Sequence, residues 1–155
     1  MSGNGRLRIK CKGIETARLT RDCLRDKRLV YVILADRKLA YPDGKSPIAY
    51  IGMTRKGVSR VLSSLAFRAK TILRLRGVRA CYVKLVTCTP RDGLETWRIL
   101  ERALLAGFRH TYGDTPRCNT QGKKLKLRKS LKHFRPERIA KILKVLEKPV
   151  PNRGA

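Results

Sequence analysis

The fold is decided by two neighbouring apolar runs, LVYVILA at residues 29–35 and IAYIG at residues 48–52. Both runs are rich in β-branched and aromatic residues and have the length of a strand, so each predicts a β-strand. Between them stand Pro42, Asp43 and Gly44. Proline fixes φ and glycine permits positive φ, which together favour a turn. We therefore expect an antiparallel hairpin whose connection is a long loop over residues 36–47.

Beyond the hairpin, the pattern of apolar residues predicts that a small α+β domain continues as helix, strand and helix, with a further helix near the end of the chain. Four elements are expected: a helix at residues 57–75, a strand at 80–87, a helix at 94–110 and a helix at 136–146. The helices follow from apolar residues at helical spacing, and the strand from a short β-branched run. The core order β-β-α-β-α predicts a three-stranded, mainly antiparallel sheet flanked by helices.

The chain is long enough for one domain with extensions. We place a basic N-terminal arm at residues 1–27, with a short helix across residues 14–25. The core occupies residues 28–120. A basic C-terminal arm, which includes the last helix and is expected to contact DNA, occupies residues 121–155.

The net charge is the most unusual feature of the composition. The 155 residues include 38 Lys and Arg but 11 Asp and Glu, a formal charge of +27. Such a surface repels itself and favours a polyanionic partner, of which nucleic acid is the first choice and an anionic membrane the second. The sequence has no apolar run of the roughly 18 residues that span a bilayer and no signal-type apolar segment. We therefore expect nucleic acid, and no membrane, as the partner.

Five cysteines are spread widely along the sequence, and they form no Cys-x-x-Cys pair. They are Cys11, Cys23, Cys81, Cys88 and Cys118. With two histidines in the whole chain, this spacing argues against a zinc site. Free thiols in a reducing compartment are the expected state. This predicts an intracellular protein, cytoplasmic or nucleoid-associated and not secreted.

One acidic residue falls inside the apolar side of the helix at 94–110. Glu101 lies between Trp97, Leu100 and Leu104 when the segment is placed on a helix at 3.6 residues per turn. A carboxylate on a core face is costly unless it is paired, protonated or bound to a cation. Glu101 is therefore either a member of a structural ion pair with a buried arginine or a metal ligand.

Four further residues have both an ordinary and a functional interpretation. Tyr31 and Tyr50 could pack across the hairpin, or could hold their phenols at a phosphate. Arg60 is either a solvated cation or a guanidinium that binds phosphate. Asn119 is either a turn residue or a group that fixes a tyrosine, a water or a phosphate.

Taken in order, these residues resemble the pattern of the GIY-YIG nuclease family over residues 29–119. The matching segments are Leu29-Val30-Tyr31, Tyr50-Ile51-Gly52-Met53-Thr54, Arg60, the run LERALL at residues 100–105, Pro116 and Asn119. The resemblance implies the GIY-YIG fold and hydrolysis of DNA phosphodiester bonds with Mg²⁺ or Mn²⁺. It also implies catalytic roles for Tyr31, Tyr50, Arg60, Glu101 and Asn119, with Glu101 as the metal ligand.

The sequence departs from the family pattern in ways that support a second hypothesis. The first motif lacks its glycine and isoleucine, and Ser64 stands where many relatives carry histidine or tyrosine. Met53 follows the second motif's glycine, where a lysine is sometimes found. The alternative is therefore a non-catalytic basic nucleic-acid-binding protein on a degenerate nuclease fold. A homodimer or association with a larger nucleoprotein complex is compatible with either.

Basic residues near the predicted site and in the C-terminal arm are candidates for DNA contact. They are Arg55, Lys56, Arg68, Lys123, Lys124, Lys126, Arg128 and Lys129. Contacts of this kind with phosphates give affinity without base recognition, and the affinity falls with salt. The alternative for the C-terminal group is a solvated tail.

Overall fold

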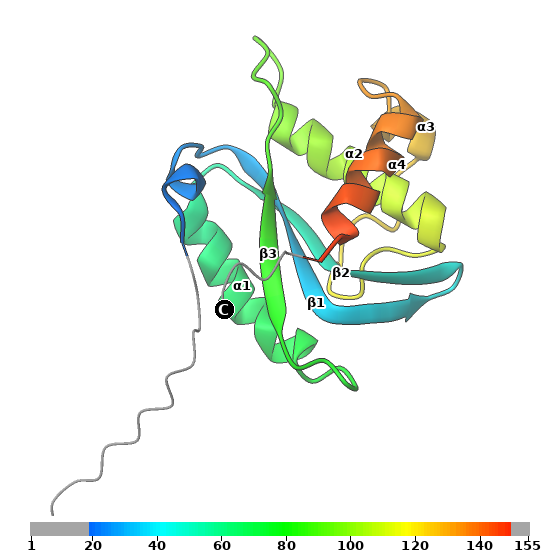
Figure 1. Cartoon of the computed structure of the whole chain (residues 1–155). Helices are drawn as coiled ribbons and strands as arrows, with labels where there is room; N and C mark the ends of the chain where they lie inside the picture. The colour runs from blue at the N-terminus through cyan, green and yellow to red at the C-terminus, as the bar shows by residue number, and fades with distance from the viewer. Residues whose placement is uncertain (1–18, 150–155) are drawn as a thin grey trace, which may run out of the picture.

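The central sheet has three antiparallel strands, as the sequence predicts. In the computed structural model, which describes residues 19–149, they are β1 (Leu29–Tyr41), β2 (Gly44–Thr54) and β3 (Cys81–Val86). Their order is β2-β1-β3, so β1 is the central strand and β2 pairs on one side only. Figure 1 shows this sheet between two groups of helices. The α+β class is confirmed.

The hairpin is tighter than expected. β1 continues to Tyr41, which pairs with Gly44, so Pro42 and Asp43 alone connect the strands. The long loop predicted at residues 36–47 is wrong. Its polar residues form a register irregularity in β1 between Leu34 and Leu39, where three side chains face solvent before Leu39 returns to the core. A bulge inside a paired strand has the same polar composition as a loop, which is why composition misled.

Helices α1 (Val58–Ile72), α2 (Thr96–Tyr112) and α4 (Pro136–Glu147) lie within a few residues of their predicted positions. A short helix, α3 (Leu127–Ser130), was not predicted. Of the helix expected at residues 14–25, the part at 14–18 lies outside the described residues. The rest contains a single 3₁₀ turn, η1 (Arg21–Leu24).

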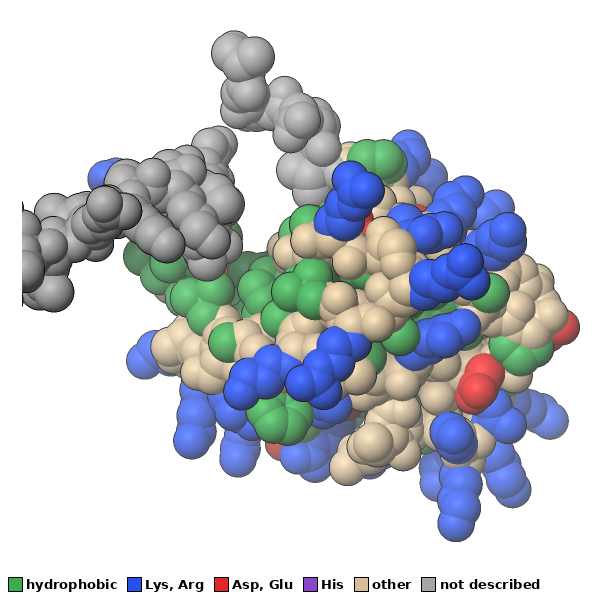
Figure 2. Space-filling model, turned by 90° about the horizontal axis from the view of Figure 1, so that it is seen from below, with side chains coloured by type: hydrophobic (Ala, Val, Ile, Leu, Met, Phe, Trp, Pro, Cys, Tyr) green, Lys and Arg blue, Asp and Glu red, His purple; other side chains and the backbone are tan. Residues whose placement is uncertain are grey.

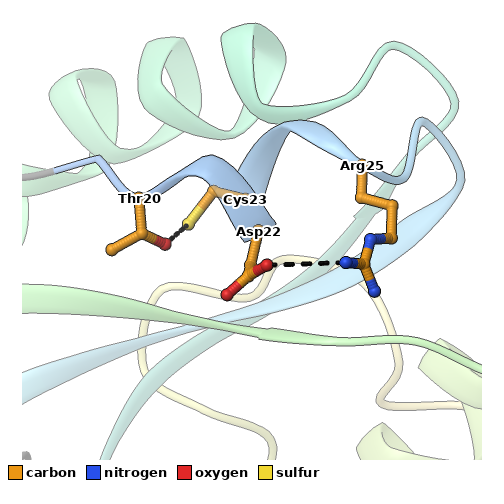
Figure 3. A network of polar contacts seen from close by, with 4 residues as sticks. All are labelled: Thr20, Asp22, Cys23 and Arg25. Carbon is orange, nitrogen blue, oxygen red and sulfur yellow. Dashed lines mark hydrogen bonds and ion pairs between the residues drawn. The ribbon is translucent and has the colours of Figure 1, made fainter.

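Exposed local contacts shape that N-terminal turn (Figure 3). The Thr20 hydroxyl and the Cys23 thiol are 3.2 Å apart, and Arg25 forms an ion pair of 3.6 Å with Asp22. Both members of the ion pair are largely exposed, so the pair contributes little to stability. The turn has no buried residue, and its local contacts hold it rather than core packing.

The alternation of side chains along β1 supplies two separate cores. Val30, Val32 and Leu34 pack with α2 and α4, whereas Tyr31 and Ile33 pack with α1 on the opposite face. Successive residues of a strand point to opposite faces, so a strand covered on both sides must be apolar throughout. This explains why residues 29–35 read as an unbroken apolar run.

The described part of the C-terminal segment is packed against the domain. Ile139, Leu143 and Leu146 of α4 belong to the same core as Leu100 and Phe108 of α2. Of the segment predicted as a C-terminal arm with a last helix, α4 packs its apolar side over the sheet, while the Lys and Arg residues around α3 stay exposed. Residues 150–155 lie outside the described part. Within residues 19–149, no helix combines the length and apolar character needed to cross a membrane.

Candidate active site

The hairpin brings Tyr31 and Tyr50 together over a glycine. Tyr31 pairs with Gly52 across the strands, and the two tyrosine rings are 5.8 Å apart between centroids at 39°. A Cβ added to Gly52 would lie 2.6 Å from Tyr50 Cε1 and 2.9 Å from both Tyr31 Cζ and the Tyr50 hydroxyl. The glycine of the second motif thus leaves the space that the ends of both tyrosine rings occupy.

Helix α1 supplies a partner for the Tyr31 hydroxyl. This hydroxyl donates a 2.8 Å hydrogen bond to the Ser64 Oγ, and both side chains are buried. Burial raises the pKa of Tyr31, and its neighbour Tyr50 acts in the same direction. The Ser64 hydrogen bond and the charge of Arg60 lower that pKa, but burial is the largest effect. Tyr31 is therefore a protonated hydrogen-bond donor at neutral pH.

Two arginines of α1 flank the tyrosines in different ways. Arg60 is exposed and lies one helical turn before Ser64, the acceptor of the Tyr31 hydrogen bond, and its charge lowers the pKa of Tyr31. Arg68 lies with its guanidinium carbon 4.4 Å from the centroid of the Tyr50 ring and donates a 3.0 Å hydrogen bond to the Cys118 carbonyl. Arg68 was predicted to contact DNA; in the structure its guanidinium lies over the Tyr50 ring.

Asn119 holds the outer edge of β2. Its Oδ1 accepts a 2.9 Å hydrogen bond from the Ile51 N–H, and its Nδ2 donates a 2.8 Å hydrogen bond to the Ile51 carbonyl. The neighbouring Cys118 N–H donates to the Ala49 carbonyl at 2.9 Å. The buried amide therefore substitutes for a further strand beside the Tyr50 motif. Both of its polar atoms are used on backbone, which makes Asn119 a positioning residue.

Glu101 lies on α2, which packs against the face of the sheet opposite α1. Its carboxylate is half-buried, and among residues 19–149 it makes no ion pair or hydrogen bond. Burial raises its pKa, and the charges of Arg102 and Arg98 oppose the shift. The expected ion pair with a buried arginine does not form within this part of the chain. The structure brings Tyr31, Tyr50 and Arg68 into contact with one another or with α1, but within residues 19–149 Glu101 makes no hydrogen bond or ion pair to any of them.

Glu101 offers a single carboxylate, which by itself would bind a divalent metal ion weakly. In the described part of the chain, no three His, Cys, Asp or Glu side chains gather at one place. Mg²⁺ is often held by one or two carboxylates and completed by water and substrate phosphates. A partly desolvated carboxylate without a protein partner suits that arrangement. Glu101 is the residue that would hold Mg²⁺ or Mn²⁺.

The predicted DNA-contacting side chains are exposed, with the exception of the half-buried Arg68. Arg55 and Lys56 lie between β2 and α1, and the five C-terminal residues lie around α3. The face drawn in Figure 2 carries many Lys and Arg side chains and few acidic ones. From residue 44 to residue 91 the sequence contains no Asp or Glu. The strand and helix that carry Tyr50, Arg60 and Arg68 are thus free of acidic residues.

A separate groove of about 630 Å³ opens where β1 begins and β3 ends. Its wall includes Arg28, whose guanidinium carbon lies 4.8 Å from the centre of the Trp97 ring, together with Asp26 and Asp92. None of the predicted catalytic residues lines this groove. Four basic residues (Arg25, Lys27, Arg28 and Arg91) outnumber these two aspartates, so the wall of the groove carries a small net positive charge.

Two features of the site, the hydroxyl of Ser64 that accepts from Tyr31 and the space above Gly52, were not predicted from the sequence. Ser64 lies one turn of helix after Arg60 and is buried, so a polar residue on the apolar side of α1 was the available signal. The contact at Gly52 depends on the register of the hairpin, which the sequence does not reveal.

Comparison of the chain with models of protein families, with curated proteins and with solved structures finds no match.

Proposed function

We propose that the chain is a metal-dependent endonuclease that hydrolyses DNA phosphodiester bonds through a GIY-YIG-type site. The observation that supports this proposal is the meeting of Tyr31 and Tyr50 over Gly52, beside two arginines of α1. Two phenols and a free guanidinium are groups that bind and orient a phosphodiester. The free thiols of the described cysteines agree with an intracellular setting.

Each residue of the group has a role that its surroundings support. Arg60, exposed and near Tyr31, binds the scissile phosphate and stabilises the charge that develops on it. The Tyr31 hydroxyl stays protonated because its pKa is raised, and it donates to Ser64, which leaves its oxygen lone pairs to accept a hydrogen bond from the attacking water. Tyr50, held under Arg68, orients the attacking water. Asn119 fixes the backbone of Ile51, the residue that follows Tyr50, through two hydrogen bonds.

Glu101 would hold the divalent ion. Bound Mg²⁺ or Mn²⁺ supplies Lewis-acid polarisation of the phosphate and stabilises the leaving oxygen. Because burial raises the pKa of Glu101, its carboxylate is harder to ionise than an exposed one and gains more from a cation. Protonation of Glu101 in mild acid therefore weakens metal binding.

The second candidate is a non-catalytic DNA-binding protein, and two contacts favour it. The Tyr31 hydroxyl is already bonded to Ser64, and both amide atoms of Asn119 are used on Ile51. Affinity would then come from the exposed basic residues alone. Binding would fall steeply with salt, by about 0.9 in log–log slope for each phosphate neutralised.

The test is nicking of supercoiled plasmid with Mg²⁺, Mn²⁺ or EDTA. Wild type is compared with Glu101→Ala, with Arg60→Ala, and with Glu95→Gln as a matched control. Glu95 is an exposed carboxylate at the start of the same helix, paired with Arg98 at 2.9 Å. The nuclease is supported if nicking requires metal, if it is lost in the first two variants, and if Glu95→Gln retains it. Wild type that binds DNA but never nicks plasmid, branched or single-stranded DNA supports the second candidate.

A further inference from the structure

The side chain of Phe67 lies largely in solvent beside the candidate site. It is 69% exposed, more than any other large hydrophobic side chain of residues 19–149. It lies on α1, the helix that also carries Arg60, Ser64 and Arg68. A single exposed aromatic residue is common on protein surfaces. Its meaning therefore depends on what surrounds it.

The Arg68 guanidinium connects Phe67 with the tyrosines. Its carbon lies 4.4 Å from the centroid of the Tyr50 ring and 5.5 Å from the centroid of the Phe67 ring. Tyr50 in turn contacts Tyr31, with ring centroids 5.8 Å apart. Phe67 is thus the exposed end of a series of planar groups that begins in the core. A group placed on its free face lies next to the candidate site.

The charge around Phe67 selects the kind of partner. Arg60, Ser63, Phe67 and Lys70 recur at spacings of three and four along α1, so they share one side of the helix, and all four are exposed. α1 has no acidic residue. An aromatic face between cations fits a nucleobase with phosphates on both sides, and it fits an apolar protein surface poorly.

Resting on the proposed nuclease function, we propose that Phe67 stacks on an unpaired nucleobase adjacent to the phosphate held by Arg60. Bases inside a duplex are stacked on both faces, so a free face is present only where the DNA is single-stranded, gapped or branched. Phe67 consequently gives the protein a preference for such DNA over intact duplex. It is a substrate-selecting residue and takes no part in the chemistry.

The test is binding of two oligonucleotides that differ in one feature. One is a duplex with a short central gap containing 2-aminopurine, and the other is the fully paired duplex, both in EDTA so that no metal-dependent cleavage occurs. Phe67→Ala should weaken binding to the gapped DNA by roughly 5- to 150-fold, equivalent to about 1–3 kcal/mol, and leave duplex binding within about threefold. Phe67→Trp should retain both the affinity and the change in 2-aminopurine fluorescence.

Leu73→Ala is the matched control, because Leu73 is a 44%-exposed apolar residue at the end of the same helix. It should leave both affinities unchanged. If Phe67→Ala and wild type have the same preference for gapped DNA while wild type nicks plasmid, the stacking role is overturned and the nuclease stands. If wild type never nicks but Phe67→Ala still loses gapped-DNA binding, the nuclease fails and the stacking role stands. If Phe67→Ala changes self-association in size-exclusion chromatography and leaves DNA binding unchanged, Phe67 contacts a second copy of the chain, and the stacking role is overturned.

Discussion

Replacement of Gly52 by alanine should displace both tyrosines of the candidate site. The added Cβ would lie 2.6 Å from Tyr50 Cε1, whereas ordinary contact begins at 3.4 Å, so that ring must retreat by about 0.8 Å. The Tyr31 ring and the Tyr50 hydroxyl, both at 2.9 Å, must move as well. Gly52 does not have a positive φ, so the backbone itself accepts alanine. The variant therefore isolates the effect of the clash.

The expected loss of stability is modest and the loss of activity is larger. Overpacking costs about 1–3 kcal/mol, and the reduced freedom of the unfolded chain returns about 0.4–1 kcal/mol. The free energy of unfolding of Gly52→Ala should therefore fall by about 1–2 kcal/mol, or roughly 3–8 °C in Tm. A misplacement near 1 Å at a reacting group can cost on the order of 100-fold in rate. We expect nicking to slow by about 10- to 100-fold.

Gly107→Ala is a suitable control for the clash. A Cβ there would also approach a neighbour at 2.6 Å, but the neighbour is Ile139 Cγ2 in the contact between α2 and α4. Urea denaturation measures the stability of both variants, and near-ultraviolet circular dichroism reports the tyrosines. Plasmid nicking at a temperature where both variants are folded measures the activity. Gly107→Ala should retain near-normal nicking per folded molecule.

The reasoning is refuted if folded Gly52→Ala nicks DNA at the wild-type rate, or if Gly107→Ala loses as much activity. The first result means that the placement of the tyrosines does not matter for cleavage. The second means that any strain in the domain abolishes activity, so the loss carries no information about the site.

Three further variants test the rest of the structure. Asn119→Ala should reduce the free energy of unfolding by about 2–4 kcal/mol in urea and accelerate amide exchange at Ile51, because two buried backbone groups lose their partner; a loss below about 0.5 kcal/mol contradicts this. Glu101→Gln should raise Tm at pH 7, with the gain disappearing below about pH 4, because burial raises the pKa of the carboxyl and its charged form costs stability; a lower Tm at pH 7 would indicate a stabilising ion pair. The pKa values of Tyr41 and Tyr112 are raised to about 12, so the folded state keeps protons that the unfolded chain releases near pH 10, and stability should fall as the pH rises from 10 to 12; removal of both hydroxyls by phenylalanine should flatten that fall in thermal denaturation.

Short-range patterns predicted most of the secondary structure. β-Branched runs located all three strands, and apolar periodicity located α1, α2 and α4, because these signals depend on neighbours along the chain. The same signals failed at residues 36–47, where polar composition describes a bulge and a loop equally well. The packing of the apolar side of α4 into the core was also not predicted, because the basic residues of the C-terminal segment give no sign of it.

In the candidate site, too, some features could be predicted from the sequence and others could not. The hairpin that carries Tyr31 and Tyr50 was predicted from the sequence, whereas the register that places both rings over Gly52 was not. The partner of Asn119 is 68 residues away, and that of Tyr31 is 33 residues away. No local pattern specifies such pairs, since they arise only after helices and loops have packed on the sheet.

The sequence by itself determined the α+β class, the presence of the three strands and the strong positive charge, because composition and periodicity act residue by residue. The tertiary structure alone decided which polar groups remain available. In the folded chain the amide of Asn119 is hydrogen-bonded to β2, and the Tyr31 hydroxyl is hydrogen-bonded to Ser64. Glu101 is unpaired within the described residues, and Phe67 is exposed beside Arg68. Hydrogen-bond partners and desolvation depend on the packing of distant segments, and packing is a property of the whole fold.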